Sequence, residues 1–261
     1  MRCVKPLTIR HPQFEDATLQ VPCGNCAYCK QDYRRMWQIR LDKESQYCLG
    51  KQYFLTLTYE IEPQYVNKKD IQLFLKRLRK SIEPYKLRYY AVSERGEKFG
   101  RIHWHMLLFT NCISDIGKHI LEAWNNGFIF VGSVTGSSIN YVLKYVLKDS
   151  ADSKVLMSQS PGIGYQYTQN EQVKLNHYDN PRRYIQLGKY RSKLPRYFLE
   201  KLYKQHKPEV PDDVIQRSIN FMDTYQRIYG TIDENNLRTG VKTMREQESE
   251  YMERLFNRKL K

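Results

Sequence analysis

Arg101-Ile102-His103-Trp104-His105-Met106-Leu107-Leu108-Phe109 is the stretch that decides how this chain is interpreted. Its apolar residues predict a buried β-strand over residues 102–109. Side chains alternate across a strand, so His103 and His105 lie on one face and can hold one ion. A single histidine on an apolar strand is usually a core residue, but each of two on one face needs hydrogen-bond partners there, which favours metal ligation.

A carboxylate that could complete the histidine pair lies just after the preceding predicted strand. Residues 86–93 and 102–109 are predicted to form a hairpin with a glycine-containing connection. Cross-strand pairing would bring Glu94 within a few ångströms of His103, whereas Glu97, nearer the turn, is a weaker rival. Two imidazoles and one carboxylate with open positions suit Mg²⁺ or Mn²⁺ bound together with substrate oxygens, although Zn²⁺ could also occupy the site.

A second candidate group lies in Tyr141-Val142-Leu143-Lys144-Tyr145-Val146-Leu147-Lys148, within a predicted helix over residues 138–149. The helical repeat stacks Tyr141, Tyr145 and Lys148 on one side. In the simpler interpretation, tyrosines at this spacing only rim a core. A phenol with a pKa near about 10 is a poor nucleophile, but Lys148 would favour the phenolate and a metal would polarise a phosphoryl oxygen. The two groups together predict phosphodiester cleavage by a tyrosine nucleophile.

The elements around these motifs predict an α+β fold. Strands are expected over residues 52–59, 86–93, 102–109 and 127–134, and helices over residues 67–82 and 114–124. The order β-α-β-β-α-β is typical of a ferredoxin-like (split βαβ) antiparallel sheet. The tyrosine helix follows directly and is expected to lie across this sheet through its apolar residues, which leaves the tyrosines and Lys148 toward the opposite edge.

The regions outside this core are less regular. A helix is predicted over residues 30–48, a long loop over residues 158–183, and helices over residues 195–205, 211–229 and 235–261, the last highly charged. We therefore expect three regions. Residues 1–49 form an N-terminal segment resembling a zinc knuckle with a helix, residues 50–150 form the catalytic core, and residues 151–261 form a loop and a basic helical region.

Three of the six cysteines are clustered in Val21-Pro22-Cys23-Gly24-Asn25-Cys26-Ala27-Tyr28-Cys29. Their spacing lets the thiolates converge on one structural Zn²⁺, with Cys3 as the fourth ligand. A disulfide, or free thiols that merely cluster, are the alternatives. Cys48 and Cys112 stand in apolar contexts and are expected to be inert core residues.

The charge of the chain indicates the kind of partner. With 43 Lys and Arg against 28 Asp and Glu, the formal net charge of +15 favours a polyanion, and 21 tyrosines supply stacking surface for unpaired bases. Nucleic acid is the natural candidate. No apolar run approaches the roughly 18 residues of a membrane-spanning helix, and the N-terminus lacks the apolar core of a signal peptide, so no membrane partner and an intracellular location are expected.

These motifs resemble those of the HUH endonucleases, and more closely those of the rolling-circle replication initiators of microviruses. Phe54-Leu55-Thr56-Leu57-Thr58-Tyr59 matches the first motif of that family, His103-Trp104-His105 the His-hydrophobic-His motif, and Tyr141-x-x-x-Tyr145-x-x-Lys148 the tyrosine motif. The cysteine segment, Ser160-Pro161-Gly162-Ile163-Gly164 and Lys193-Leu194-Pro195-Arg196-Tyr197 are similar to those of gokushovirus-type members, so the resemblance covers residues 3–203. Ile102 stands where such proteins often carry proline, which concerns a turn and not a ligand.

The resemblance implies a nickase and joinase with an HUH-type fold that acts at a phage origin. Tyr141 or Tyr145 would form a 5′-phosphotyrosine link and leave a 3′-hydroxyl for the host DNA polymerase. The other tyrosine would cleave the regenerated origin, and a circle would be released. The sequence has no GxxxxGK[ST] motif, so a host helicase would unwind the strands in the cytoplasm of the bacterial host.

Two other functions remain open at this point. The same chemistry serves in a transposase or in a plasmid mobilisation or replication nickase. A non-catalytic zinc-containing DNA-binding protein is a different class, in which the sheet only stacks bases. That class leaves the histidine pair and the tyrosine face without a role.

Overall fold

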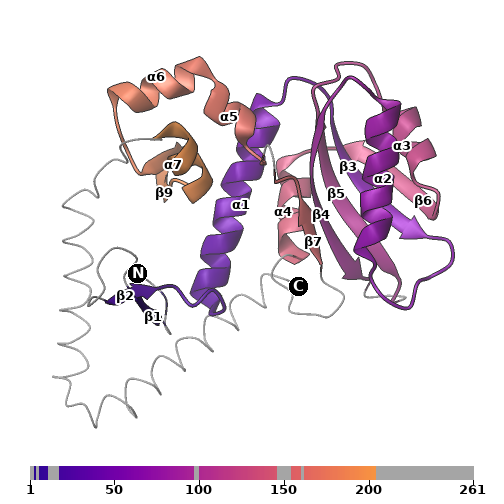
Figure 1. Cartoon of the computed structure of the whole chain (residues 1–261), viewed down its shortest axis with the longest axis horizontal. Coiled ribbons are helices and arrows are strands. Elements are labelled where there is room, and N and C mark those ends of the chain that lie inside the picture. Colours follow the sequence, from indigo (N-terminus) through magenta and orange to yellow (C-terminus); the bar gives the residue numbers. More distant parts are fainter. Residues whose placement is uncertain are drawn as a thin grey trace, which may run out of the picture. The chain divides into compact units, whose positions relative to one another are not determined.

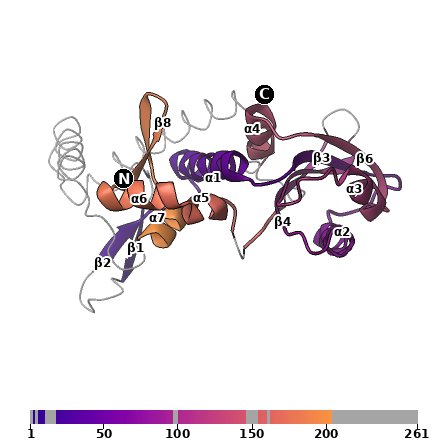
Figure 2. The same cartoon turned by 90° about the horizontal axis from the view of Figure 1, so that it is seen from above.

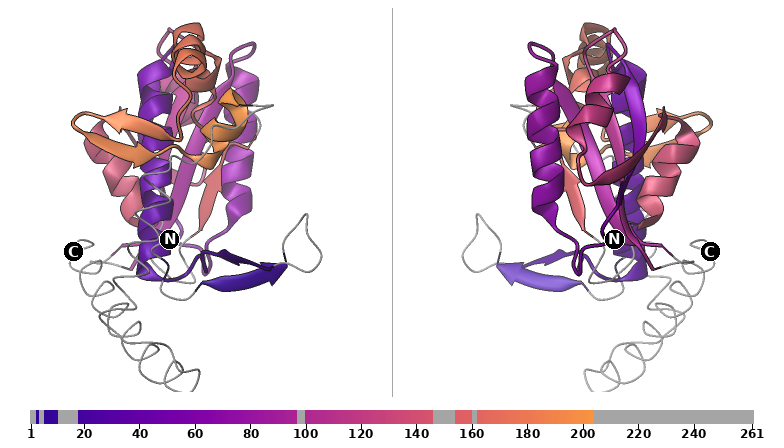
Figure 3. Two further views of the ribbon diagram at one scale, coloured as in Figure 1. Left: turned by 90° about the vertical axis from the view of Figure 1, so that its left-hand side faces the viewer. Right: turned by 90° about the vertical axis from the view of Figure 1, so that its right-hand side faces the viewer.

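The computed structural model describes residues 3, 6–10, 18–96, 100–145, 154–159 and 162–203. The chain divides into two units, Met1–Arg35 with Pro208–Lys261, and Met36–Lys207. In the first unit, β1 (Leu7–Arg10) and β2 (Thr18–Val21) form an antiparallel hairpin (Figure 3). Helix α1 (Ala27–Tyr47) begins in this unit and continues into the second. The helices predicted over residues 211–229 and 235–261 lie outside the described residues.

The central sheet lies in the second unit and has the strand order β6-β3-β5-β4-β7, with every neighbouring pair antiparallel. Its strands are β3 (Gln52–Tyr59), β4 (Leu87–Arg95), β5 (Ile102–Thr110), β6 (Gly127–Ser133) and β7 (Val155–Met157). Helix α2 (Lys68–Ser81) connects β3 to β4, and α3 (Gly117–Ala123) connects β5 to β6. The predicted α+β fold with a ferredoxin-like split βαβ sheet is confirmed. Strand β7 was not predicted.

Helices α2 and α3 cover one face of the sheet (Figure 2). Strand β3 alternates strictly between half-buried and buried residues, with Leu55 and Leu57 on the buried side. These leucines belong to one apolar cluster with Phe74 and Leu78 of α2 and with Trp104 of β5. Because Trp104 points into this layer, the histidines on either side of it point to the opposite face.

The opposite face is partly covered by α4 (Gly136–Tyr145) and by the portion of α1 that belongs to the second unit (Figure 2). Trp37 of α1 and Val142 of α4 pack in one cluster with Tyr90 and Leu107 of the sheet. The rings of Trp37 and Tyr90 lie 4.9 Å apart. The prediction that the tyrosine helix packs its apolar residues on the sheet is therefore confirmed over the described part of that helix, which ends at Tyr145.

The prediction of a long loop over residues 158–183 is wrong for residues 165–179. Helices α5 (Tyr165–Gln169) and α6 (Glu171–Asp179) occupy these residues and are separated by Asn170. This residue ends α5, and its side chain accepts a hydrogen bond from the Val173 N–H to cap α6. The composition rich in Gln, Asn and Gly hid two short helices, because a polar helix of one or two turns shows no apolar period.

The rest of this region adds the hairpin β8 (Tyr184–Leu187) to β9 (Tyr190–Lys193) and α7 (Arg196–Leu202), which confirms the helix predicted over residues 195–205 (Figures 1 and 3). The buried His177 ring joins α5 to the end of α7, since its ring nitrogens lie 3.2 Å from the Tyr167 hydroxyl and 2.6 Å from the Tyr203 hydroxyl. Burial lowers the pKa of His177 to about 4, so this link is neutral at pH 7. No described helix is long and apolar enough to cross a membrane.

Candidate active site

Three side chains of metal-ligand type meet at the end of the β4–β5 hairpin. Glu94 and His103 are directly paired residues of the two strands, and His105 follows on the same face. Glu94 Oε1 lies 2.6 Å from His103 Nε2 and 3.0 Å from His105 Nε2. The structure thus brings together the three residues that the sequence suggested as ligands, with their ligand atoms within 4.8 Å of one another. Glu97 lies outside the described residues.

The far sides of the two imidazole rings are held by neighbouring groups. His103 Nδ1 lies 3.0 Å from the carbonyl oxygen of Arg101, which can only accept, so Nδ1 donates there. A neutral His103 therefore directs the lone pair of Nε2 at the Glu94 carboxylate. Two lone pairs at this distance repel each other unless a cation or a proton lies at the site. The donor set consequently fits a divalent cation, with Thr56 Oγ1 holding His105 Nδ1 at 3.1 Å.

Two of the three side chains are already in the protonation state that metal ligation requires. Burial by itself would raise the pKa of Glu94, but hydrogen bonds from His103 and His105 outweigh it and lower the pKa to about 2. Burial lowers the pKa of His105, whose side chain is 5% exposed. Burial also acts to lower the pKa of His103, but the contact with Glu94 raises it overall. Glu94 is thus ionised and His105 is neutral at pH 7, as ligation requires, whereas a bound cation would displace the proton that Glu94 favours on His103.

Both predicted tyrosines of α4 contact His105. The Tyr141 hydroxyl lies 3.4 Å from His105 Nε2. The Tyr145 ring stacks on the His105 ring with centroids 5.6 Å apart, and the two tyrosine rings lie 5.0 Å apart. Tyr141 is 39% exposed and Tyr145 only 6%. Tyr145 therefore also packs in the core of this face, and Tyr141 is the more exposed of the two residues. Lys148 lies outside the described residues.

Strand β3 supplies supporting residues whose role the sequence analysis missed. The Phe54 ring lies parallel to His105 with centroids 5.9 Å apart, and it meets the edge of Tyr141 at 6.1 Å. Thr56, two residues on, holds His105. The signal was present, because Phe54 and Thr56 alternate with Leu55 and Leu57, which the other layer buries. This alternation could have assigned both residues to the histidine face.

Two exposed phenylalanines of β6 lie in the same rows of the sheet as the histidines. Phe130 pairs with Thr56, and Thr56 pairs with His105; Phe128 pairs with Thr58, which in turn pairs with the other histidine. Phe128 is 66% exposed and Phe130 is 61% exposed. An exposed aromatic pair next to a cluster of polar ligands is a platform on which flat, apolar groups could stack. The sequence analysis missed this pair.

The four cysteines of the first unit also converge. Cys23 Sγ lies 4.0 Å from Cys29 Sγ, and Cys26 Sγ lies 3.9 Å from Cys3 Sγ. Thiolates bound at about 2.3 Å in a tetrahedron lie roughly 3.8 Å apart, so these spacings fit Zn²⁺, whereas a disulfide needs about 2 Å. Gly24 has φ of +80°, and this turn lets the Cys26 N–H donate to Cys23 Sγ.

The two remaining cysteines lie apart from the cluster. Cys112 is buried in the apolar layer under α2 and α3, as predicted for a core residue. Cys48 is only half-buried, and its thiol lies 3.3 Å from the Thr110 carbonyl oxygen. Burial raises the pKa of Cys48, so this thiol is protonated and unreactive at pH 7.

Comparisons with known proteins find similar replication-associated proteins. Residues 52–150, which include Glu94, both histidines and both tyrosines, match a family model that describes replication-associated proteins of the ORF2 type. The replication-associated protein ORF2 of Spiroplasma virus 4 is 28% identical over 229 residues, which cover 75% of this chain and 72% of that protein. The replication-associated protein VP4 of Bdellovibrio phage phiMH2K is 33% identical over 164 residues, which cover 52% and 51%.

A third relative, the replication-associated protein ORF4 of Chlamydia phage 1, is 27% identical over 229 residues, which cover 74% of this chain and 56% of that protein. The chain thus spans about half the length of the second and third of these relatives, and more of the first.

We expect the Glu94 cluster to bind a divalent cation measurably. Saturation with Mn²⁺ at about 100 times its Kd would add about 2.7 kcal/mol to the free energy of unfolding. For a unit of this size that corresponds to a rise in Tm of roughly 5–10 °C, measurable by calorimetry. Glu94→Gln and His103→Gln should abolish the rise, whereas His119→Ala, which changes a histidine outside the cluster, should preserve it. An equal rise in the Glu94→Gln protein would mean that the cation binds elsewhere.

Proposed function

Because this chain belongs to the replication-associated proteins of the microviruses, we propose that it nicks and rejoins single-stranded DNA at a phage origin, and so starts and ends rolling-circle replication. The enzyme would be a site-specific endonuclease and strand transferase that depends on Mg²⁺ or Mn²⁺. Its nucleophile would be a tyrosine of α4. A transposase or a plasmid nickase would use the same chemistry, but the three relatives above are replication proteins of phages.

One observation carries this proposal. The Tyr141 hydroxyl lies within 3.4 Å of a histidine that shares the carboxylate oxygen of Glu94 with a second histidine. A phosphodiester bound at the three ligand atoms would therefore lie next to the phenol oxygen, which is the proximity that nucleophilic attack requires. The non-catalytic alternative gives these four side chains no role.

Each side chain then has a definite task. A divalent cation held by Glu94, His103 and His105 would polarise a non-bridging phosphoryl oxygen. The Tyr141 oxygen would attack the phosphorus and form the 5′-phosphotyrosine bond while the bond from phosphorus to O3′ breaks, which leaves a 3′-hydroxyl. Lys148 would favour the phenolate. No water attacks the phosphorus, so the energy of the phosphodiester is kept for rejoining.

The second tyrosine would close the cycle. Tyr145 would attack the regenerated origin after one round of synthesis by the host DNA polymerase, with a host helicase separating the strands. The freed 3′-hydroxyl would then attack the first phosphotyrosine and release a circle in the cytoplasm of the bacterial host. Tyr141 would act first, because it is far more exposed than Tyr145 and DNA would reach it more readily.

We expect phenylalanine substitutions to separate the two tyrosines. Tyr141→Phe should slow the first nick more than Tyr145→Phe, each single variant should fail to complete nicking and circularisation, and the double variant should form no covalent adduct. The measurement is a denaturing gel after incubation with an origin oligonucleotide and Mn²⁺. Tyr178→Phe, at an exposed residue of α6, serves as the control. Covalent linkage of DNA to the double variant would place the nucleophile elsewhere.

Phe128 and Phe130 would stack the bases next to the scissile phosphate. Stacking of one base on an aromatic ring contributes about 1–3 kcal/mol, so Phe128→Ala and Phe130→Ala should each weaken binding of a single-stranded oligonucleotide at least about fivefold. Fluorescence anisotropy in EDTA measures this without cleavage. Leu121→Ala removes an exposed apolar side chain from α3 and should leave the affinity unchanged. If all three variants bound the oligonucleotide as tightly as the wild type, bases would not stack on β6.

Cys3, Cys23, Cys26 and Cys29 would hold a structural Zn²⁺. We expect protein purified without added zinc to contain about one equivalent of tightly bound zinc, because closed thiolate sites bind very strongly. Elemental analysis should show that Cys23→Ser reduces the zinc content and that Cys48→Ser does not. Rapid reaction of all four thiols with a thiol reagent in the native protein would contradict a zinc site.

A further inference from the structure

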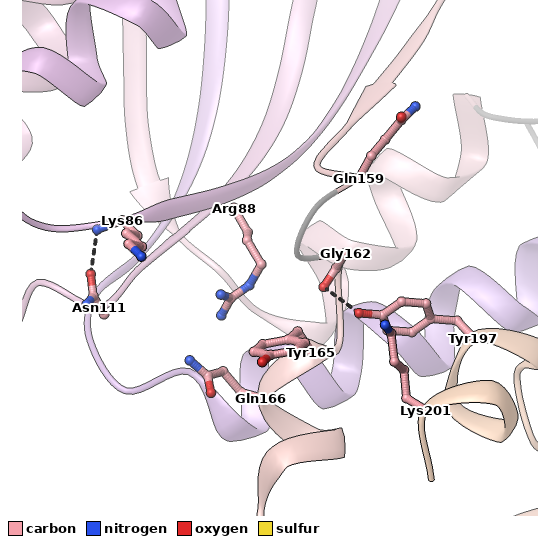
Figure 4. A pocket seen from close by; sticks show the side chains of 9 residues that line it. All are labelled: Lys86, Arg88, Asn111, Gln159, Gly162, Tyr165, Gln166, Tyr197 and Lys201. Atoms are coloured by element: carbon pink, nitrogen blue, oxygen red, sulfur yellow. Dashed lines mark hydrogen bonds between the residues drawn. The ribbon is translucent and has the colours of Figure 1, made fainter. Parts of the chain in front are cut away.

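A second concave site lies at the other end of β4. It is a cavity of about 490 Å³ in the second unit, formed by the start of β4, the end of β5, α5 and α7 (Figure 4). Its lining combines three kinds of side chain. Three are cationic (Lys86, Arg88 and Lys201), two are aromatic (Tyr165 and Tyr197), and three are amides (Asn111, Gln159 and Gln166). Among the residues that the structure describes, no acidic side chain lines the cavity.

The central cation of the cavity is held in place by a buried partner. Arg88 Nε donates to Glu44 Oε1 at 2.5 Å, and the Glu44 side chain is fully buried. The other oxygen of Glu44 accepts the Gly164 N–H at 2.6 Å. The single charge of Glu44 thus positions Arg88, while Lys86 and Lys201 are exposed cations of the lining. Figure 4 shows the terminal nitrogens of Arg88 directed into the cavity, beside Tyr165.

Two motifs that the nicking chemistry leaves unexplained meet at this cavity. Gly162 belongs to the Ser160-Pro161-Gly162-Ile163-Gly164 motif and Tyr197 to the Lys193-Leu194-Pro195-Arg196-Tyr197 motif. A Cβ at Gly162 would lie 3.0 Å from Arg40 Nη2 and 3.2 Å from the Tyr197 ring. Arg40 in turn lies 4.2 Å from the centroid of the Tyr197 ring and donates to the Ile163 carbonyl. The two motifs therefore build one wall, which presents Tyr197 to the cavity.

The cavity is related to the candidate active site through β4. Arg88 and Glu94 lie on the same face of this strand, six residues apart, which is about 20 Å. Tyr90 and Val92 between them are buried. At the B-form rise of about 3.4 Å per nucleotide, that straight-line distance corresponds to roughly six nucleotides of one strand. An adjoining hollow of about 860 Å³ shares Lys86, Arg88 and Gln159 and adds Arg79, Lys68 and one acidic residue, Glu83, so its charged lining stays mainly cationic.

We propose that this cavity binds a nucleotide of single-stranded DNA about six nucleotides from the phosphate at the histidine cluster. Lys86, Arg88 and Lys201 bind the phosphate, the Tyr165 ring stacks on the base, and the amides of Asn111 and Gln166 meet its polar edge. The choice of DNA as the strand rests on the proposed function. A free nucleotide offers the same phosphate and base, and the test separates the two sources.

Binding is measured in EDTA, so no cleavage occurs and the result does not depend on the nicking chemistry. The probe is a fluorescent oligothymidylate of about 20 nucleotides, titrated at several salt concentrations. The variant Lys86→Gln/Lys201→Gln should bind about tenfold more weakly and show a smaller salt dependence by about one unit of slope. Lys118→Gln/Lys189→Gln removes the same charge at two exposed lysines outside the cavity and should bind much like the wild type.

Substitution of Arg88 would leave the buried charge of Glu44 without its partner, so Arg88 is not a suitable test position. Tyr165 provides an independent check instead. Tyr165→Phe should retain the affinity and Tyr165→Ala should lose at least about fivefold. An equal loss of oligonucleotide affinity in the two double lysine variants would mean that only net charge matters, and it would overturn the proposal. The proposal would also be overturned if the lysine substitutions weakened the binding of thymidine monophosphate but not that of the oligonucleotide. A protein that binds as expected yet forms no adduct would refute the nicking function and leave the cavity in place.

Discussion

The antiparallel pairing of β4 with β5 is the constraint on which the candidate site depends. Glu94 stands opposite His103 in this pairing, and both histidines share its carboxylate oxygen. Because side chains alternate with a period of two, a register shift of one residue would turn Glu94 to the α2 face and separate it from the imidazoles. The apolar layer under α2 opposes that shift, since Trp104 and Met106 are completely buried there. The core thereby protects the geometry of the polar face.

The tyrosines depend on a different set of contacts. Helix α4 is held on the sheet by Ile139, Val142 and Leu143, and this packing sets the height of both phenol rings above His105. Phe54 stacks on His105 and lies beside Tyr141, so strand β3 supports both rings. Both tyrosines stand on one helix, about one turn apart, so their Cα atoms are separated by roughly 6 Å along its axis.

The sequence predicted the elements with strong periodicity and missed those set by tertiary contacts. Strand β3 and helix α2 were predicted to within a residue, because alternation and a 3.6-residue period are local signals. Strand β7 has three residues and exists only because β4 has a free edge. Helices α5 and α6 are short and polar, and Asn170 between them looked like part of a loop. The pairing of Glu94 with His103 could be predicted, because a hairpin brings together residues that are close in sequence. The cavity joins Lys86 to Lys201, which are far apart in sequence, and no local pattern could predict it.

Strand β6 is an edge of the central sheet among the described strands, and it bears the two exposed phenylalanines. An edge with unpaired backbone groups and apolar side chains is also a place where identical molecules add strand to strand. The formal charge of +15 keeps molecules apart at low ionic strength. Salt screens that repulsion beyond about 10 Å at 0.1 M and leaves the apolar attraction intact. The free protein is therefore more prone to self-association as the ionic strength rises. A molecule bound over β6 would prevent association through this edge.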